Sequence, residues 1–160
     1  MKILITGGTG FIGKELQKQL KESGHKVVIL SRRGGDFLWN PDKGKMDGRA
    51  LEGVDAIIHL AGAGIAEKRW TDSRKEELIQ SRVQSSQILY QALKQHSHQV
   101  KTLVSASGIG YYGADTGEKL CEENSEPGHD FIATCTQAWE SSLQGIEGLG
   151  IRVVKFRIGL

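Results

Sequence analysis

The chain has 160 residues, of which 38% are hydrophobic and 25% are charged, and its formal net charge is +2. The length and composition allow one globular domain and exclude a disordered chain, while the small net charge gives no basis for binding nucleic acid or a membrane surface. With two cysteines, no apolar run near the ~18 residues that span a bilayer and no secretory signal, we expect a cytoplasmic protein without disulfides or membrane helices.

Short apolar runs alternate along the chain with longer segments of helical periodicity. The runs predict six strands, at residues 2–6, 27–30, 37–39, 56–60, 100–104 and 151–156. The periodicity predicts three helices, at residues 12–24, 71–94 and 131–144. Because apolar strands that alternate with amphipathic helices are typical of a parallel sheet covered on both faces, we predict an α/β fold with a doubly wound parallel sheet of the Rossmann type over residues 1–160.

Some details of this pattern are more specific. The second helix is expected to begin with a capping box at Ser73 and Glu76, and its polar run 72–77 is expected to face solvent. The chain stops after the sixth strand, whereas a doubly wound domain usually continues into a covering helix or a second lobe, so we expect the N-terminal part of a longer protein, without its C-terminal substrate lobe. The apolar helical faces are all assigned to packing against the sheet, so no partner surface is predicted.

A glycine triad with the spacing G-x-x-G-x-x-G lies between the first strand and the first helix. Glycines in this context allow a tight turn and let a pyrophosphate approach the backbone, and the helix N-terminus offers N–H donors and partial positive charge. The turn therefore predicts dinucleotide binding, although a plain tight turn is the structural alternative. The predicted contact residues are Gly7, Thr9, Gly10, Phe11, Ile12 and Gly13.

The second strand ends in Ser31, Arg32 and Arg33. Sites that prefer NAD usually carry an acidic residue about 20 residues after the glycines, where it binds the ribose 2′-hydroxyl. Two arginines in its place can form charge-assisted bonds with a 2′-phosphate, and the Ser31 hydroxyl can join them. The turn favours NADP(H) over NAD, the alternative being a solvated basic turn. Trp39 and Asn40 end the third strand and are expected near the adenine.

The fourth strand ends in small residues that leave room for a ligand, and Leu60, Ala61 and Gly62 are predicted to contact the cofactor. His59 precedes them and is expected to be packed or hydrogen-bonded rather than a catalytic base. No group of residues has metal-ligand spacing, so no metal site is predicted.

The fifth strand runs into the serine- and glycine-rich segment 105–113. A serine hydroxyl at the carboxyl end of a strand can donate a hydrogen bond to a substrate oxygen or relay a proton. Ser105 is predicted to contact the cofactor, and Ser107 is a catalytic candidate. A serine that only satisfies the loop backbone is the alternative.

Together these segments resemble the extended short-chain dehydrogenase/reductase superfamily, and within it an atypical branch of nucleoside-diphosphate-sugar epimerases. The matching segments are 1–13, 54–62, 68–70 with 81–82, 105–113, 139–140 and 157–159. The resemblance covers the whole chain and implies a protein about twice as long, whose C-terminal part completes the substrate pocket. It also implies an NAD(P) cofactor and a small-molecule substrate such as a sugar nucleotide.

The resemblance is incomplete at the catalytic residues. The superfamily carries a Tyr-x-x-x-Lys pair on the helix after the serine loop, but the corresponding stretch, 131–136, contains neither residue. Ser107 is the best match to the catalytic serine. Tyr111 or Tyr112 is a candidate to replace the lost tyrosine, with Arg82 or Lys68 as the accompanying cation. Cys135, on the same helix as 131–136, is expected to be a small core residue rather than a reactive group.

Two hypotheses of function follow. In the first, the protein is an NADP(H)-dependent oxidoreductase or epimerase that acts on a hydroxyl or keto group, with Ser107 and a tyrosine orienting the oxygen. In the second, it binds NADP(H) without catalysis, as a redox sensor or a scaffold, because the proton-transfer pair has been lost.

Overall fold

A computed structural model describes residues 1–159 of the chain. Seven strands form one sheet in the order β4-β3-β2-β1-β5-β6-β7. The strands are β1 (Lys2–Thr6), β2 (Lys26–Ser31), β3 (Phe37–Asn40), β4 (Lys45–Met46), β5 (Ala56–His59), β6 (Thr102–Gly108) and β7 (Arg152–Ile158). The helices are α1 (Phe11–Glu22), α2 (Asp72–Gln95), α3 (Phe131–Ser141) and α4 (Gln144–Glu147). All neighbouring strands run parallel except β3 and β4, which pair antiparallel.

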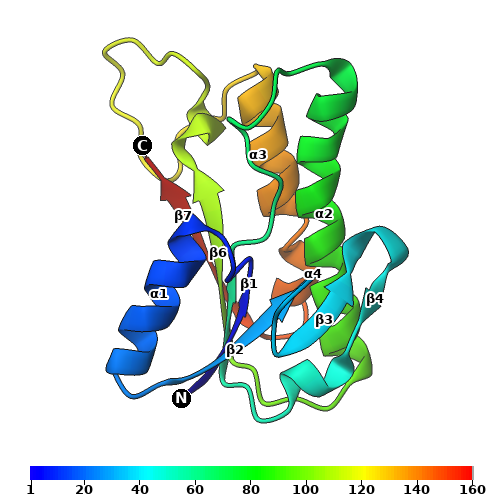
Figure 1. The fold of residues 1–160 in the computed structure, drawn as a ribbon. Helices are drawn as coiled ribbons and strands as arrows, with labels where there is room; N and C mark the ends of the chain where they lie inside the picture. The colour runs from blue at the N-terminus through cyan, green and yellow to red at the C-terminus, as the bar shows by residue number, and fades with distance from the viewer. Residues whose placement is uncertain (160) are drawn as a thin grey trace.

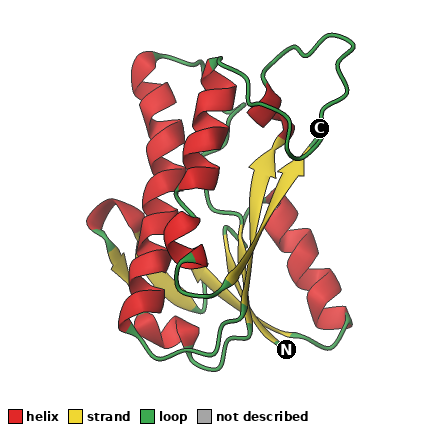
Figure 2. Cartoon of the chain, turned by 180° about the vertical axis from the view of Figure 1, so that it is seen from behind, coloured by secondary structure: helices red, strands yellow, loops and turns green. Residues whose placement is uncertain are grey.

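The sheet is covered on both faces, which confirms the doubly wound α/β fold. Helix α1 lies on one face, and α2, α3 and α4 lie on the other (Figures 1 and 2). The larger apolar cluster fills the space under α2 and α4 and includes Leu4, Ile57, Leu89, Leu103 and Ile146. A smaller cluster under α1 consists of Ile3, Ile5 and Ile29, against which Leu20 packs. No helix of residues 1–159 is long and apolar enough to cross a membrane.

The sheet is longer than the sequence predicts. The two-residue strand β4 was not predicted, because a bridge of two residues leaves no periodic pattern to read. Strand β6 extends to Gly108, beyond the predicted end at residue 104, because β7 pairs with it throughout and places Ser107 opposite Arg157. Ser105 and Ser107 therefore lie within strand β6 and not in a loop after it.

The helices also differ in detail from the prediction. The predicted helix 131–144 is split into α3 and α4, with Leu143 as the N-cap of α4. The capping box at Ser73 was a wrong prediction: Thr71 is the N-cap of α2, and its hydroxyl accepts a hydrogen bond from the Arg74 N–H. The run 72–77 is not uniformly solvated, because the Arg74 side chain is buried and pairs with Glu77 at 2.7 Å.

Candidate functional site

The connections that leave neighbouring strands at the carboxyl edge of the sheet go to opposite faces between β1 and β5. Strands β1 and β5 are neighbours, but β1 leads into α1 on one face and β5 leads into α2 on the other (Figure 1). In open α/β sheets ligands bind at such a switch point, beside the carboxyl ends of the strands. Most of the site residues predicted from the sequence lie along this edge.

The glycine turn after β1 has no room for side chains at two positions. Gly7 has a φ of +70°, and a Cβ atom there would lie 2.7 Å from the carbonyl of Leu60, the residue that follows the neighbouring strand β5. A Cβ atom on Gly13 would lie 2.5 Å from the carbonyl oxygen of Gly7, so this glycine lets α1 approach the turn. The turn closes through a hydrogen bond from the Gly10 N–H to the Gly7 carbonyl at 3.0 Å.

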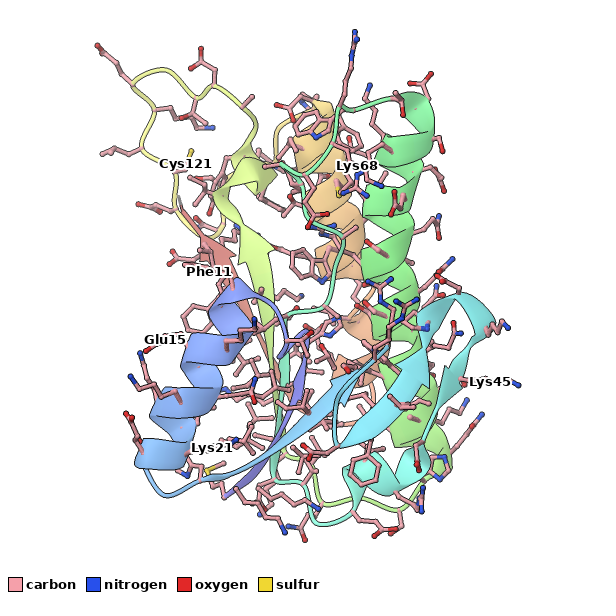
Figure 3. All side chains as sticks on the ribbon, in the orientation of Figure 1. Phe11, Glu15, Lys21, Lys45, Lys68 and Cys121 are labelled. Atoms are coloured by element: carbon pink, nitrogen blue, oxygen red, sulfur yellow. The ribbon has the colours of Figure 1, made fainter. Side chains whose placement is uncertain are left out.

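The N-terminus of α1 is open to a ligand. Its N-cap is Gly10, no side chain caps it, and its first turn has no acidic residue. Phe11 is 95% exposed at this turn, where Figure 3 labels it. Ile12 is 47% exposed, so it does not pack against the sheet as the predicted apolar face requires. A ligand above the turn would meet free N–H donors and apolar surface.

A cleft of about 550 Å³ adjoins the glycine turn at the end of β2. It is lined by Thr9, Ser31, Arg32, Arg33, Trp39, Asn40 and Asp42. Both arginines are exposed, and the buried Ser31 hydroxyl donates to the Arg33 carbonyl at 2.6 Å, so this hydroxyl shapes the turn. Asp42 is the one acidic residue of the lining. The structure thus brings the basic turn, Trp39 and Asn40 together in one cleft.

His59 is fully buried at the end of β5, as predicted for a packed residue. Its Nδ1 lies 2.7 Å from the Thr6 hydroxyl, and its Nε2 lies 3.3 Å from the hydroxyls of Ser85 and Ser86. Burial, with a smaller contribution from the nearby Arg82 cation, lowers the pKa of His59 to about 4. The imidazole is therefore neutral at pH 7 and joins β1, β5 and α2.

The loop after β5 follows the same edge. The Leu60 N–H donates to the Thr6 carbonyl at 3.1 Å, and the Ala61 N–H lies 3.3 Å from the Thr6 hydroxyl. Gly62 lies against the side chain of Arg82, because a Cβ atom on it would be 3.2 Å from the guanidinium carbon. The three predicted contact residues of this loop therefore lie beside the glycine turn and in front of α2.

The two serines of β6 have different partners. Ser105 is fully buried, and its hydroxyl donates to the carbonyl of Ala106 at 2.9 Å. Ser107 is nearly buried and donates to Oε1 of Glu140 on α3 at 2.5 Å. Its hydroxyl oxygen keeps its acceptor lone pairs for a substrate hydroxyl.

Glu140 in turn forms a two-pronged ion pair with Arg157 on β7. The Nε and Nη2 atoms of Arg157 donate to the two Glu140 oxygens, each at 2.9 Å. Burial raises the pKa of the Glu140 carboxyl, but the hydrogen bonds from Arg157 and Ser107 outweigh it, so its pKa lies below the usual range. Glu140 is therefore ionised at pH 7 and holds Ser107 in place.

Arg157 connects this network to the two tyrosines that follow β6. Its guanidinium lies 3.5 Å from the ring centroid of Tyr111, and its Nη1 donates to the Tyr112 hydroxyl at 2.8 Å. The Tyr112 hydroxyl donates to the carbonyl of Glu122 at 2.7 Å. Within residues 1–159 the Tyr111 hydroxyl has no hydrogen-bond partner. The doubled tyrosine thus has one engaged hydroxyl and one free hydroxyl.

The prediction that Arg82 or Lys68 accompanies these tyrosines was wrong. Arg82 stacks on Trp139 instead, with 5.0 Å from the guanidinium carbon to the ring centroid. Lys68 is exposed on the loop near α2 and α3 (Figure 3). The cation is Arg157 because the pairing of β6 with β7 places it opposite Ser107. Glu140 and Arg157 lie in segments that carry the family resemblance, but no local pattern gives them a role because they are distant from Ser107 along the chain.

Two further expectations concern groups without a role in this network. Cys135 is 2% exposed in the core, as predicted, and burial raises the pKa of its thiol. Among the described residues 1–159, no three His, Cys, Asp or Glu side chains are grouped so that they could hold a metal ion.

A Rossmann sheet with a glycine turn and a basic cleft at its carboxyl edge defines a dinucleotide-binding type of domain. The chain belongs to the NAD dependent epimerase/dehydratase family, whose model matches residues 3–135. It is 35% identical over 162 residues to the epimerase family protein Mb2239 of Mycobacterium bovis, an alignment that covers 99% of this chain and 53% of the relative. The chain thus spans about half the length of the curated relatives it matches.

Solved structures show the same likeness. The nucleoside-diphosphate sugar epimerase of Corynebacterium glutamicum is 34% identical with a TM-score of 0.85, over 98% of this chain and 33% of that one. Human epimerase family protein SDR39U1, solved with NADPH, is 31% identical with a TM-score of 0.80, over 98% and 53%. MoeE5, solved with UDP-glucose and NAD, is 25% identical with a TM-score of 0.79, over 98% and 54%. The resemblance to the short-chain dehydrogenase/reductase type of epimerase is confirmed.

Proposed function

We propose that this chain is the NADP(H)-binding part of an oxidoreductase or epimerase that acts on a hydroxyl or keto group of a small substrate such as a sugar nucleotide. The observation that carries the cofactor proposal is the cleft at the end of β2, where Arg32 and Arg33 stand beside Thr9 of the glycine turn. Two exposed guanidinium groups at that place match a 2′-phosphate, which NADP has and NAD lacks. The NADPH in the SDR39U1 structure supports this choice, and the NAD in the MoeE5 structure makes it one to test.

The rest of the dinucleotide would follow the carboxyl edge. The pyrophosphate would lie on the N-terminus of α1 at the residues from Gly7 to Gly13, where uncapped N–H groups are available. The nicotinamide half would pass Leu60, Ala61 and Gly62 toward the end of β6. Ser105 would contribute through its backbone, because its hydroxyl is already bonded to Ala106.

Catalysis would fall to Ser107 and Tyr111. When bound, the nicotinamide supplies hydride transfer. Ser107 would accept a hydrogen bond from the substrate hydroxyl, because its own proton is directed at Glu140. Tyr111 would exchange the proton, since its hydroxyl is free while that of Tyr112 is engaged by Arg157 and Glu122. The stacked Arg157 cation stabilises a developing phenolate.

The decisive experiment is a fluorescence titration with NADPH and NADH of the chain and of an Arg32→Ala, Arg33→Ala double variant. We expect the variant to lose at least about tenfold in NADPH affinity, since each charge-assisted bond contributes about 1.5–3 kcal/mol. NADH affinity should stay within about twofold, because NADH has no 2′-phosphate. Equal loss for both nucleotides would contradict the assignment of the arginines, and no binding of either would contradict the cofactor site itself.

The second candidate function is NADP(H) binding without catalysis, as a redox sensor or scaffold. It is favoured by the absence of tyrosine and lysine from α3 and by the engagement of Ser107 with Glu140. The test is turnover of NADPH over a panel of keto compounds and UDP-hexoses by the chain, Tyr111→Phe and Tyr112→Phe. Turnover that falls only in Tyr111→Phe supports catalysis, whereas bound NADPH without turnover in all three supports the sensor.

A further inference from the structure

Helix α2 carries a buried cation that lacks a counter-ion. Arg82 is 7% exposed, yet among residues 1–159 no carboxylate lies within ion-pair distance of it. Its only hydrogen bond there runs from Nη1 to the Leu78 carbonyl at 2.8 Å. Arg74 lies nearer the N-terminus of the same helix and is equally buried, but it forms ion pairs with two carboxylates, Glu67 and Glu77. Buried charges in proteins are normally paired, so Arg82 is the exception that needs an explanation.

A second unsatisfied donor lies against the first. Arg82 stacks over the ring of Trp139 on α3, and the indole N–H of Trp139 is buried without a hydrogen-bond partner in the described structure. Trp139 is only 8% exposed. A buried N–H that stays unpaired is destabilising, and native proteins usually supply it with an acceptor. Two facing helices therefore present a cation without an anionic partner and an N–H donor without an acceptor.

The Arg82 guanidinium also lies beside Gly62, in the loop that follows β5. A Cβ atom on Gly62 would lie 3.2 Å from the Arg82 guanidinium carbon and 3.4 Å from its Nε, so Nε is next to the loop that follows β5. Since Nη1 is bonded to Leu78, the Nε and Nη2 atoms form the fork that is left for a ligand. Two parallel N–H groups in one plane match the two oxygens of a carboxylate.

We infer that Arg82 and the Trp139 indole N–H form a receptor for a carboxylate group on the small-molecule substrate, beside Gly62 at the carboxyl edge of the sheet. The inference rests on the proposed function, which supplies a substrate to this place. One guanidinium neutralises the single charge of a carboxylate, and the indole N–H adds a hydrogen bond. The substrate class is thereby narrowed to hydroxy or keto compounds that carry a carboxylate.

The experiment follows the three tryptophan indole ¹⁵N–¹H resonances of the chain during titration with sodium acetate, at constant ionic strength in a zwitterionic sulfonate buffer. A Trp139→Phe variant assigns the resonance. We expect the Trp139 resonance to shift saturably with acetate and to stay in place with acetamide, which has the same shape without charge. Arg82→Gln should raise the acetate Kd at least about tenfold, the loss typical of a charge-assisted bond. Arg69→Gln, which removes an exposed arginine from the nearby loop, should leave it unchanged.

Three results would overturn the receptor. The first is a Trp139 resonance that does not shift with acetate, and the second is an acetate-induced shift of the same size in Arg82→Gln. The third is tighter binding of inorganic phosphate than of acetate, which would assign the site to another anion. NADPH affinity is measured on the same samples. If the chain binds NADPH but its Trp139 resonance does not respond to acetate, the receptor is refuted and the proposed cofactor site is retained. If the chain binds acetate but not NADPH, the cofactor site is refuted and the receptor is retained. Retained NADPH binding in Arg82→Gln also shows that this variant is folded.

Discussion

The two ends of the carboxyl edge are built in opposite ways. At the proposed cofactor end, no side chain caps the N-terminus of α1, and Arg32 and Arg33 are exposed in the basic cleft. At the β6–β7 end, Ser107, Glu140, Arg157 and Tyr112 are bonded to one another in a chain of contacts. The first end has exposed cations and an uncapped helix N-terminus, whereas the second end is a set of side chains that hold each other in position.

The difference shows where each kind of site comes from. Recognition of a dinucleotide depends on backbone shape and on a few neighbouring side chains, so residues that are close in the sequence suffice. Positioning of Ser107 depends on partners 33 residues away on α3 and, through them, on β7. Changes at the first end should act on the turn itself, and changes at the second end should act through the network.

The largest effect is expected from Gly13→Ala at the cofactor end. The added methyl group would overlap the backbone of Gly7 and Gly8, which no rotamer change can relieve. We expect a loss of about 3 kcal/mol in the free energy of unfolding, together with loss of NADPH binding. Urea unfolding and cofactor titration measure the two effects. Gly148→Ala is the control, because its Cβ atom would have only ordinary contacts, and an equal loss there would contradict the steric explanation.

His59, which joins strands β1 and β5 between the two ends, should make stability depend on pH. Its pKa is about 4 in the folded chain against the ordinary value of 6.5, so at pH 5 the unfolded chain binds a proton that the native chain does not. Stability should therefore fall by about 2 kcal/mol from pH 7.5 to pH 5. Urea unfolding at both values tests this. The drop should shrink in His59→Gln and persist in His129→Gln, whose histidine is exposed.

At the β6–β7 end, Glu140→Gln should destabilise the chain by about 1–2 kcal/mol, because it leaves the Arg157 guanidinium without its charged partner in a half-buried place. The exposed pair of Arg49 with Asp47 offers a matched comparison, since solvent screens it and Arg49→Gln should destabilise the chain much less than Glu140→Gln. Thermal or urea unfolding of both variants measures the difference. Equal effects would mean that the buried network is no more than a surface ion pair.

The smallest effect on stability is expected at the start of α2, which lies outside the two ends compared above. Thr71→Ala removes the N-cap hydroxyl and should cost about 1 kcal/mol. Ser73→Ala should cost close to nothing, because Ser73 lies inside the first turn and caps no N–H group in residues 1–159. Urea unfolding of both variants distinguishes the Thr71 cap seen in the structure from the Ser73 cap that the sequence predicts. A larger loss of stability in Ser73→Ala than in Thr71→Ala would support the Ser73 cap.

Much of the fold was predictable because apolar runs and helical periods are local features. Strand β1 has the predicted limits, and the order of strands and helices is as expected except for β4 and the split of the last predicted helix into α3 and α4. The end of β6 and the cap of α2 were not predictable from periodicity. Pairing with β7 decides the first, and the choice between Thr71 and Ser73 depends on the angle at which the chain enters the helix.

The sequence by itself determined the α/β fold, the glycine turn and the basic residues beside it, because each of these depends on residues that are neighbours in the chain. Only the tertiary structure decided which cation meets the tyrosines, which tyrosine keeps a free hydroxyl, and which acid holds Ser107. Those contacts join Glu140, Arg157 and Tyr112 across separate elements. The register of β6 against β7 and the packing of α3 bring them together, and neither is written in any local pattern.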